Sequence, residues 1–172
     1  MSLDSNLYEK SIKILTDLIS FKTISGKENG PLIDYCDFIL KENGVSTFRV
    51  FDNNKERVNL FGTIKTKKTN GKKPIILSGH TDVVPVSKGW STDPFVGTVK
   101  GDKLYGRGSC DMKGFIACAL AYAPVYSKSK LDRDIHFSFT FDEETACKGA
   151  PILIEELKKR GIKKGICIVG EP

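Results

Sequence analysis

The sequence predicts an α/β fold: a mixed, mostly parallel sheet with helices on both faces. Two observations support this prediction. Stretches with apolar residues at helical spacing alternate with short apolar stretches of strand length along the 172 residues. Several of the strand-like stretches are apolar throughout, which is typical of strands buried on both faces. This alternation favours strands joined by helices that cover the two faces of one sheet.

The amino-terminal half supplies two predicted helices and three predicted strands. Pro31 opens the second helical stretch and Gly44 closes it, which is the usual punctuation of a helix. The stretch STFRVFD alternates as a strand does, whereas PIILSGH is a continuous apolar run. The predictions are helices over 7–20 and 31–44 and strands over 46–52, 58–65 and 74–80.

The carboxy-terminal half predicts a hairpin followed by alternating helices and strands. The hairpin is centred on Gly101 and Asp102, and Pro124 is expected to end or kink the helix after it. The predictions are a hairpin over 97–108, helices over 112–126 and 149–161, and strands over 134–144 and 165–172.

The composition is that of an ordinary soluble globular protein, with 40% hydrophobic and 28% charged residues. The net charge of +6 is concentrated in residues 65–73 and 158–164. These basic runs contain no aromatic residues, which argues against a nucleic-acid partner, so we interpret them as solvated turns or helix ends. A mildly positive field could still favour anionic groups on a substrate.

The cysteines and the apolar runs predict a cytoplasmic protein. The chain has five cysteines and no CxxC pair, which argues against a disulfide framework. The first residues are polar and charged, unlike a signal peptide. The longest apolar run, residues 114–126, is too short to cross a bilayer. We therefore expect a reducing compartment and no membrane partner.

Acidic residues and one of the two histidines lie where predicted strands end. His80 and Asp82 follow the first buried strand, the run Asp142-Glu143-Glu144 follows another, and Glu171 follows the last. A glycine-rich turn places Asp111 before a helix. In α/β sheets, sites form at the carboxyl ends of strands, so we expect these groups to converge. Carboxylates packed together repel one another unless a cation is present.

A metal site accounts for this pattern. Imidazole and carboxylate ligands without a thiolate suit zinc, cobalt or manganese. In this interpretation His80 binds the metal, and Asp82 orients and polarises the imidazole. Taken alone, His-x-Asp or a run of acids is more often structural or solvated. We interpret His136 as a packed or edge residue and Cys110 as structural, because neither has matching neighbours in the sequence.

Several motifs together resemble the zinc aminoacylase and carboxypeptidase family of co-catalytic metallohydrolases, most of all its acetylornithine deacetylase branch. The similarity runs from about residue 7 to residue 172, and LYGRGSCDMKGF is its most specific block. It implies a zinc exopeptidase-like catalytic domain. The motifs are SGHTDVVPV, GWSTDPF, LYGRGSCDMKGF, DEE followed by CKGA, and VGEP. In DEETACKGA, Thr145 and Ala146 replace a more usual apolar residue and glycine.

The resemblance also implies roles for individual residues. Asp111 would bridge two Zn²⁺ ions, with Co²⁺ as a possible substitute, and the Asp111–Met112 peptide would be cis. His80 and Glu171 would complete one metal site and Glu144 would belong to the other. The remaining two roles are catalytic: Glu143 as general base and Asp82 as the support of His80.

The resemblance further implies a distal histidine and a lid domain with dimer contacts, neither of which is found up to Pro172. We therefore expect residues 1–172 to be the amino-terminal part of the catalytic domain, inactive alone, with at most one tightly bound metal. The expected whole enzyme is a homodimer that hydrolyses N2-acetylornithine to ornithine and acetate in arginine biosynthesis. Alternatives are a succinyl-diaminopimelate desuccinylase, a metal-dependent dipeptidase, and a non-catalytic metal-binding or interaction module.

Overall fold

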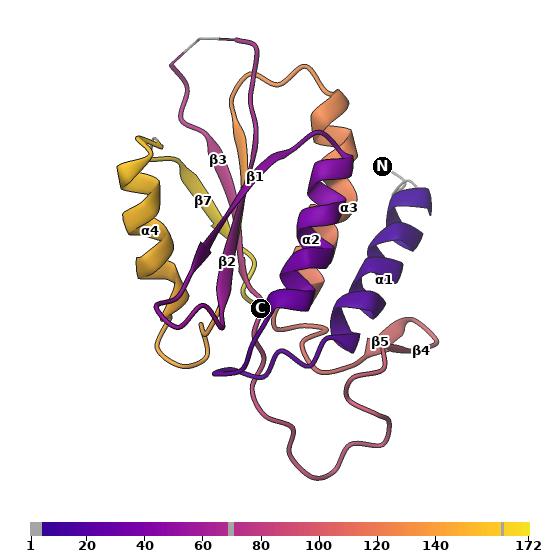
Figure 1. Ribbon diagram of the computed structural model, residues 1–172. Helices are drawn as coiled ribbons and strands as arrows, with labels where there is room; N and C mark the ends of the chain where they lie inside the picture. Colours follow the sequence, from indigo (N-terminus) through magenta and orange to yellow (C-terminus); the bar gives the residue numbers. More distant parts are fainter. Residues whose placement is uncertain (1–4, 69–70, 163) are drawn as a thin grey trace.

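The computed structural model describes residues 5–68, 71–162 and 164–172. Five strands form one sheet in the order β1-β2-β6-β3-β7 (Figure 1). The sheet is mixed, because β1–β2 and β2–β6 pair antiparallel whereas β6–β3 and β3–β7 pair parallel. The strands are β1 (Ser46–Phe51), β2 (Val58–Ile64), β3 (Ile75–His80), β6 (Ile135–Thr140) and β7 (Ile166–Val169). A separate hairpin pairs β4 (Thr98–Lys100) with β5 (Lys103–Tyr105), as predicted.

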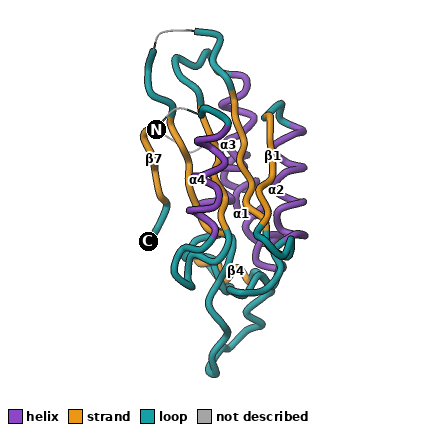
Figure 2. The backbone as a smooth tube through the Cα atoms, turned by 60° about the vertical axis from the view of Figure 1, so that its left-hand side comes forward, coloured by secondary structure: helices purple, strands orange, loops and turns teal. Residues whose placement is uncertain are grey.

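Helices cover both faces of the sheet, which confirms the predicted fold class. Three helices lie on one face and one on the other, so the molecule has three layers (Figures 1 and 2). The three are α1 (Ser5–Ser20), α2 (Gly30–Glu42) and α3 (Lys113–Lys128), and the single helix is α4 (Gly149–Lys159). None of the helices in the described part of the chain has the length and apolarity needed to span a bilayer.

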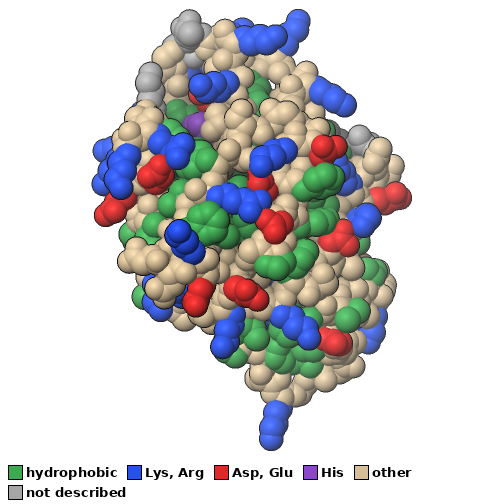
Figure 3. All heavy atoms as spheres, in the orientation of Figure 1, with side chains coloured by type: hydrophobic (Ala, Val, Ile, Leu, Met, Phe, Trp, Pro, Cys, Tyr) green, Lys and Arg blue, Asp and Glu red, His purple; other side chains and the backbone are tan. Residues whose placement is uncertain are grey.

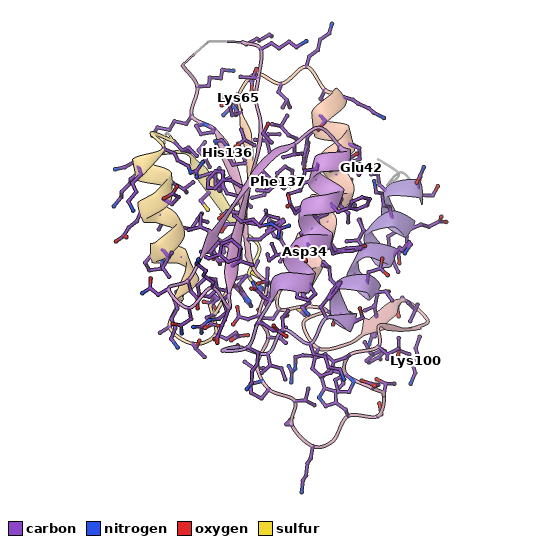
Figure 4. All side chains as sticks on the ribbon, in the orientation of Figure 1. Asp34, Glu42, Lys65, Lys100, His136 and Phe137 are labelled. Carbon is purple, nitrogen blue, oxygen red and sulfur yellow. The ribbon has the colours of Figure 1, made fainter. Side chains whose placement is uncertain are left out.

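The main core lies between the sheet and the three-helix layer. Phe137 of β6 is fully buried there, on the side of the sheet that faces α2 in Figure 4. Because side chains alternate along a strand, its neighbour His136 lies on the α4 side. The fully buried core includes Leu18, Ile33, Leu40, Leu60, Ile116, Leu120 and Phe139.

A buried lysine ties the first turn of α3 to the end of α1. The Lys113 side chain is fully buried, and its ammonium donates hydrogen bonds to the carbonyl oxygens of Leu18 and Phe21 at 2.9 and 2.8 Å. These carbonyls lie at and just after the carboxyl end of α1, where each also accepts one backbone hydrogen bond, from Phe21 and Thr23 respectively. The contact fixes the position of the turn that carries Asp111.

Two boundary predictions are wrong. Helix α3 continues through Pro124 to Lys128. A proline removes one backbone hydrogen bond, but Leu120, Ala121 and Ala123 are buried, and their packing favours the helix over that loss. Strand β6 stops at Thr140 rather than at residue 144, because Asp142 has a φ of 51°, which is incompatible with an extended strand.

Candidate metal centre

The predicted site residues converge at one edge of the sheet. His80 is the last residue of β3, the pair Glu143 and Glu144 follows β6, and Glu171 follows β7. Asp111 precedes α3 by two residues. Strands β6, β3 and β7 are adjacent and parallel, so their carboxyl ends lie side by side. The parallel part of the sheet therefore brings these groups together.

His80 lies at the centre of this cluster. Its Nε2 atom is 3.0 Å from Asp111 Oδ1, 3.5 Å from Glu171 Oε1 and 3.9 Å from Glu143 Oε2. Among the residues that the structure describes, two groups have ligand atoms within 4.8 Å of one another: His80 with Asp111 and Glu144, and His80 with Glu143 and Glu171. Both groups depend on the same imidazole.

Asp82 lies behind the imidazole and also holds the acidic loop. His80 Nδ1 is 2.9 Å from the Asp82 carbonyl oxygen and 3.4 Å from its carboxylate. The carboxylate accepts hydrogen bonds from the Ser25 hydroxyl at 2.7 Å and from the backbone N–H groups of Glu143 and Glu144. Burial alone would raise the pKa of the Asp82 carboxyl, but these hydrogen bonds lower it.

The electrostatics of the cluster favour a bound cation. Burial raises the pKa of Glu144 and of Glu171, and the nearby Asp111 charge raises both further. Burial opposes protonation of His80, but the contacts with Asp82 raise its pKa to about 9. The raised pKa values of Glu144 and Glu171 mean that neighbouring carboxylates destabilise one another when all of them are charged. One imidazole and several carboxylates fit a divalent ion such as Zn²⁺, Co²⁺ or Mn²⁺.

The loop after β6 is held by contacts that sequence reasoning missed. Asp142 is buried, and its carboxylate accepts hydrogen bonds from Arg57 at 2.6 Å and from the Gly26 backbone N–H at 2.7 Å. Arg57 also pairs with Asp52. These partners are far away in the sequence, and no local motif points to them. Together with Ser25, they position Glu143 and Glu144 relative to β3.

Other details of the loops agree with the expectations. The Asp111–Met112 peptide is cis, as the resemblance implies. Ala146 has a φ of 71°, a conformation that suits the more usual glycine better than alanine. Cys147 donates a hydrogen bond from its thiol to Glu143 Oε1 at 3.4 Å. Neither Cys147 nor Cys110 belongs to the candidate metal groups among the described residues.

The family model described as "Peptidase family M20/M25/M40" matches residues 76–172, more than half of the chain. The chain belongs to peptidase family M20/M25/M40. This membership confirms the resemblance drawn from the motifs. The match covers all the predicted site residues, from His80 to Glu171.

Curated members of the M20 family align with most of this chain. A succinyl-diaminopimelate desuccinylase from Rickettsia massiliae is 38% identical over 170 residues, which is 94% of this chain and 43% of the relative. An acetylornithine deacetylase from Myxococcus xanthus is 39% identical over 161 residues, covering 92% of this chain and 40% of the relative. The chain thus spans about two fifths of the length of these relatives.

Solved structures of M20 proteins share the fold. The M20 metallo-carboxypeptidase Sso-CP2 from Sulfolobus solfataricus superposes with a TM-score of 0.77 at 23% identity, covering 98% of this chain and 37% of that one. Human carnosine dipeptidase 1 gives a TM-score of 0.74 at 21% identity, covering 98% of this chain and 39% of that one. At these identities the likeness establishes the fold alone.

Proposed function

We propose that this chain forms the metal-binding part of a metal-dependent amidohydrolase that removes an N-acyl group from a small amino acid. The observation that carries the proposal is the convergence of four carboxylates on the single imidazole of His80. His80, Asp111 and Glu171 would hold one Zn²⁺ ion. Asp111 would bridge to a second ion bound by Glu144, and Co²⁺ is a possible substitute for zinc.

The chain's own residues divide the remaining work. Bound metal supplies Lewis acidity for the attacking water and for the amide carbonyl. Glu143 takes the proton of the water and passes it to the leaving amine as general base and then general acid. Its carboxylate borders the cluster, and Cys147 holds one of its oxygens. Asp82 keeps His80 oriented through the Nδ1 side of the ring.

The proposed substrate is N2-acetylornithine, which would yield ornithine and acetate in arginine biosynthesis. It is supported by the Myxococcus relative and by the motif residues VPV and DMKGF. N-succinyl-diaminopimelate is an equally supported candidate, because the Rickettsia relative is a desuccinylase of nearly the same identity. For the whole protein we propose a cytoplasmic homodimer in which a lid domain and a distal histidine, outside residues 1–172, complete the site.

A hydrolysis panel tests the proposal. The 172-residue chain and the complete product of its gene would be incubated with acetylornithine, succinyl-diaminopimelate and dipeptides, with added Zn²⁺ or Co²⁺. We expect metal-dependent release of acetate or succinate by the complete product. Preferred turnover of dipeptides would replace the acyl-amino-acid proposal with a dipeptidase. Metal binding with no turnover of any substrate would indicate a non-catalytic metal-binding module.

A further inference from the structure

Described residues from both basic runs of the sequence line one cleft far from the metal centre. The cleft has a volume of about 780 Å³, in the range of small-molecule sites. It lies where β3 and β6 begin, whereas the metal centre lies where they end. Among its described lining residues, Asp134 is the only carboxylate. The basic lining residues are Lys65, Lys68, Lys72, Arg133 and Arg160.

Figures 3 and 4 show the same end of the molecule. Several lysine and arginine side chains and few acidic ones are visible among uncharged atoms at the end at the top of Figure 3. Lys65 and His136 are labelled at that end of the sheet in Figure 4, with Lys65 nearer the tip. The cleft therefore opens beneath a surface that is mainly positive. Its charge attracts anions at a distance from the carboxylates of the metal centre.

A buried histidine forms part of the cleft lining. The His136 residue is only 4% exposed, and its ring stacks on Phe61 with the centroids 5.0 Å apart. Its Nδ1 atom is 3.0 Å from the Thr63 hydroxyl, and both residues line the cleft. No described residue pairs with its other ring nitrogen, Nε2. This nitrogen is the group through which the buried ring can contact a bound molecule.

Arg160 is held in place before any ligand arrives. Its guanidinium lies over the Phe48 ring, 4.0 Å from the centroid, and its Nε donates to Glu156 at 2.6 Å. Phe48 also lines the cleft, but the arginine covers its face. A guanidinium fixed in this way needs little further ordering to bind an oxyanion. Because the aromatic face is covered, the cleft offers no platform for stacking nucleic-acid bases.

We propose that this cleft binds a small phosphate-bearing anion. Arg160, Arg133 and His136 line the cleft from three different segments, together with Lys65, Lys68 and Lys72, and two of these cations, Arg133 and Lys72, are paired with Asp132. Fork-shaped guanidinium donors together with lysine charges match the several oxygens of a phosphate or diphosphate group. A ligand that carried only one carboxylate group would leave most of these donors without a partner on the ligand. The proposal involves no residue of the metal centre and does not depend on the proposed function.

The histidines allow a direct test, because the chain has only two. Inorganic pyrophosphate would be titrated into the metal-free chain while imidazole resonances are followed by NMR, with His136→Gln used for assignment. We expect the His136 signals to shift to saturation and those of His80 to stay in place. Chloride at equal ionic strength should shift neither. An unmoved His136, or a response confined to His80, would overturn the proposal.

Variants separate a built site from a general charge effect. Arg160→Gln should weaken pyrophosphate binding by about tenfold or more. Arg107→Gln is the matched control, because it removes the same charge from an arginine that lies 5.3 Å over Trp90, outside the cleft. It should keep the parent affinity.

If Arg160→Gln loses its folded amide spectrum, the double variant Lys65→Gln with Lys68→Gln replaces it, and the same weakening is expected. Equal weakening by Arg107→Gln would contradict the proposal. Binding of oligonucleotides but not of pyrophosphate would contradict it too.

Discussion

Glu143 has contacts that suit two different roles. Its Oε2 atom is 3.9 Å from His80 Nε2, which is near enough for the carboxylate to belong to a ligand group. Its Oε1 atom instead accepts a hydrogen bond from Cys147. A carboxylate restrained in this way can remain beside a metal without binding it. We therefore keep Glu143 as the general base and Glu144 and Glu171 as ligands.

Replacing Glu143 by glutamine should separate the two roles. In the complete gene product, Glu143→Gln should lower turnover by ~10²–10⁴-fold, because the amide cannot accept the proton of the water. Metal content, measured after dialysis, should stay nearly unchanged. The control is His80→Gln, which should lose metal and activity together. Retention of more than about a tenth of the parent turnover by Glu143→Gln would show that another group is the base.

A site residue could be predicted from the sequence where it lies at or near the end of an apolar strand. His80 ends such a strand, and Glu143, Glu144 and Glu171 follow such strands within four residues, so they could be proposed as site residues before the fold was known. Ser25, Arg57 and Asp142 hold the site through contacts between distant segments. Those contacts arise only once the α1–α2 and β1–β2 connections pack against the ends of β3 and β6, and no local pattern encodes that packing.

At the scale of elements, an acidic side chain joins α2 to β1. Asp37 of α2 is buried, and its carboxylate accepts hydrogen bonds from Arg49, Thr47 and Lys41. Burial raises the pKa of this carboxyl, but the three donors outweigh burial and lower it. Asp34 contacts the same Arg49 from an exposed position. The helix is thereby anchored to the outer strand of the sheet.

This anchor predicts a specific acid sensitivity. Since the folded pKa of Asp37 is lowered, its stabilisation is present above the unfolded pKa of about 3.9 and is lost as pH falls through the folded value. Asp37→Asn should lower the free energy of unfolding by ~1–3 kcal/mol at neutral pH. The difference from the parent should shrink in acid, as urea unfolding at several pH values would reveal.

The exposed neighbour provides the control for this experiment. Asp34→Asn removes the same charge and a contact with the same arginine, but it should cost less than ~1 kcal/mol, because Asp34 is solvated. Equal losses for the two variants, or a difference between parent and Asp37→Asn that does not depend on pH, would show that burial of Asp37 is not the source of the stabilisation.

The elements themselves were more predictable than their arrangement. Capping glycine and proline residues and the apolar periodicity located every helix and strand to within a few residues, except at Pro124 and the end of β6. The order of the strands was not encoded locally. Strands β2 and β3 follow one another in the sequence, but β6 lies between them in the sheet. It pairs antiparallel with β2 and parallel with β3. Such pairing depends on the global packing of the helices.

On the scale of the whole molecule, β7 leaves an apolar edge. It is the last strand of the sheet, and Ile166, Ile168 and Val169 are each about half exposed. Apolar edge strands promote pairing between copies. We expect the 172-residue chain to self-associate, and Ile168→Lys to reduce the associated fraction measured by light scattering.

A second isoleucine tests whether the strand edge is responsible. Ile154 on α4 is 49% exposed, close to the 46% of Ile168, but it lies on a helix. Ile154→Lys should therefore leave the association unchanged. A clean monomer for the parent chain would refute the prediction. Equal solubilisation by the two substitutions would mean that net charge, and not the strand edge, governs the behaviour.

Metal binding should stabilise the whole fold, because its ligands come from four separate parts of it. His80, Asp111, Glu144 and Glu171 lie at the ends of β3, β6 and β7 and before α3, so the unfolded chain does not present the site. At a free zinc concentration about 100-fold above Kd, the gain is ~2.7 kcal/mol. For a domain of this size, this corresponds to a rise in Tm of about 5–10 °C. A chelator should reverse the rise.

The stoichiometry follows from the single imidazole. Both candidate groups use His80, whose Nδ1 atom is occupied by the Asp82 carbonyl, so only Nε2 can bind an ion. One tightly bound ion per chain is expected, because a site of carboxylates and water alone binds zinc weakly. His80→Gln should abolish the zinc-induced rise in Tm, and His136→Gln should preserve it. Two tightly bound ions per chain would contradict this stoichiometry, and loss of the effect in His136→Gln alone would mean that the ion binds at the opposite end of the sheet.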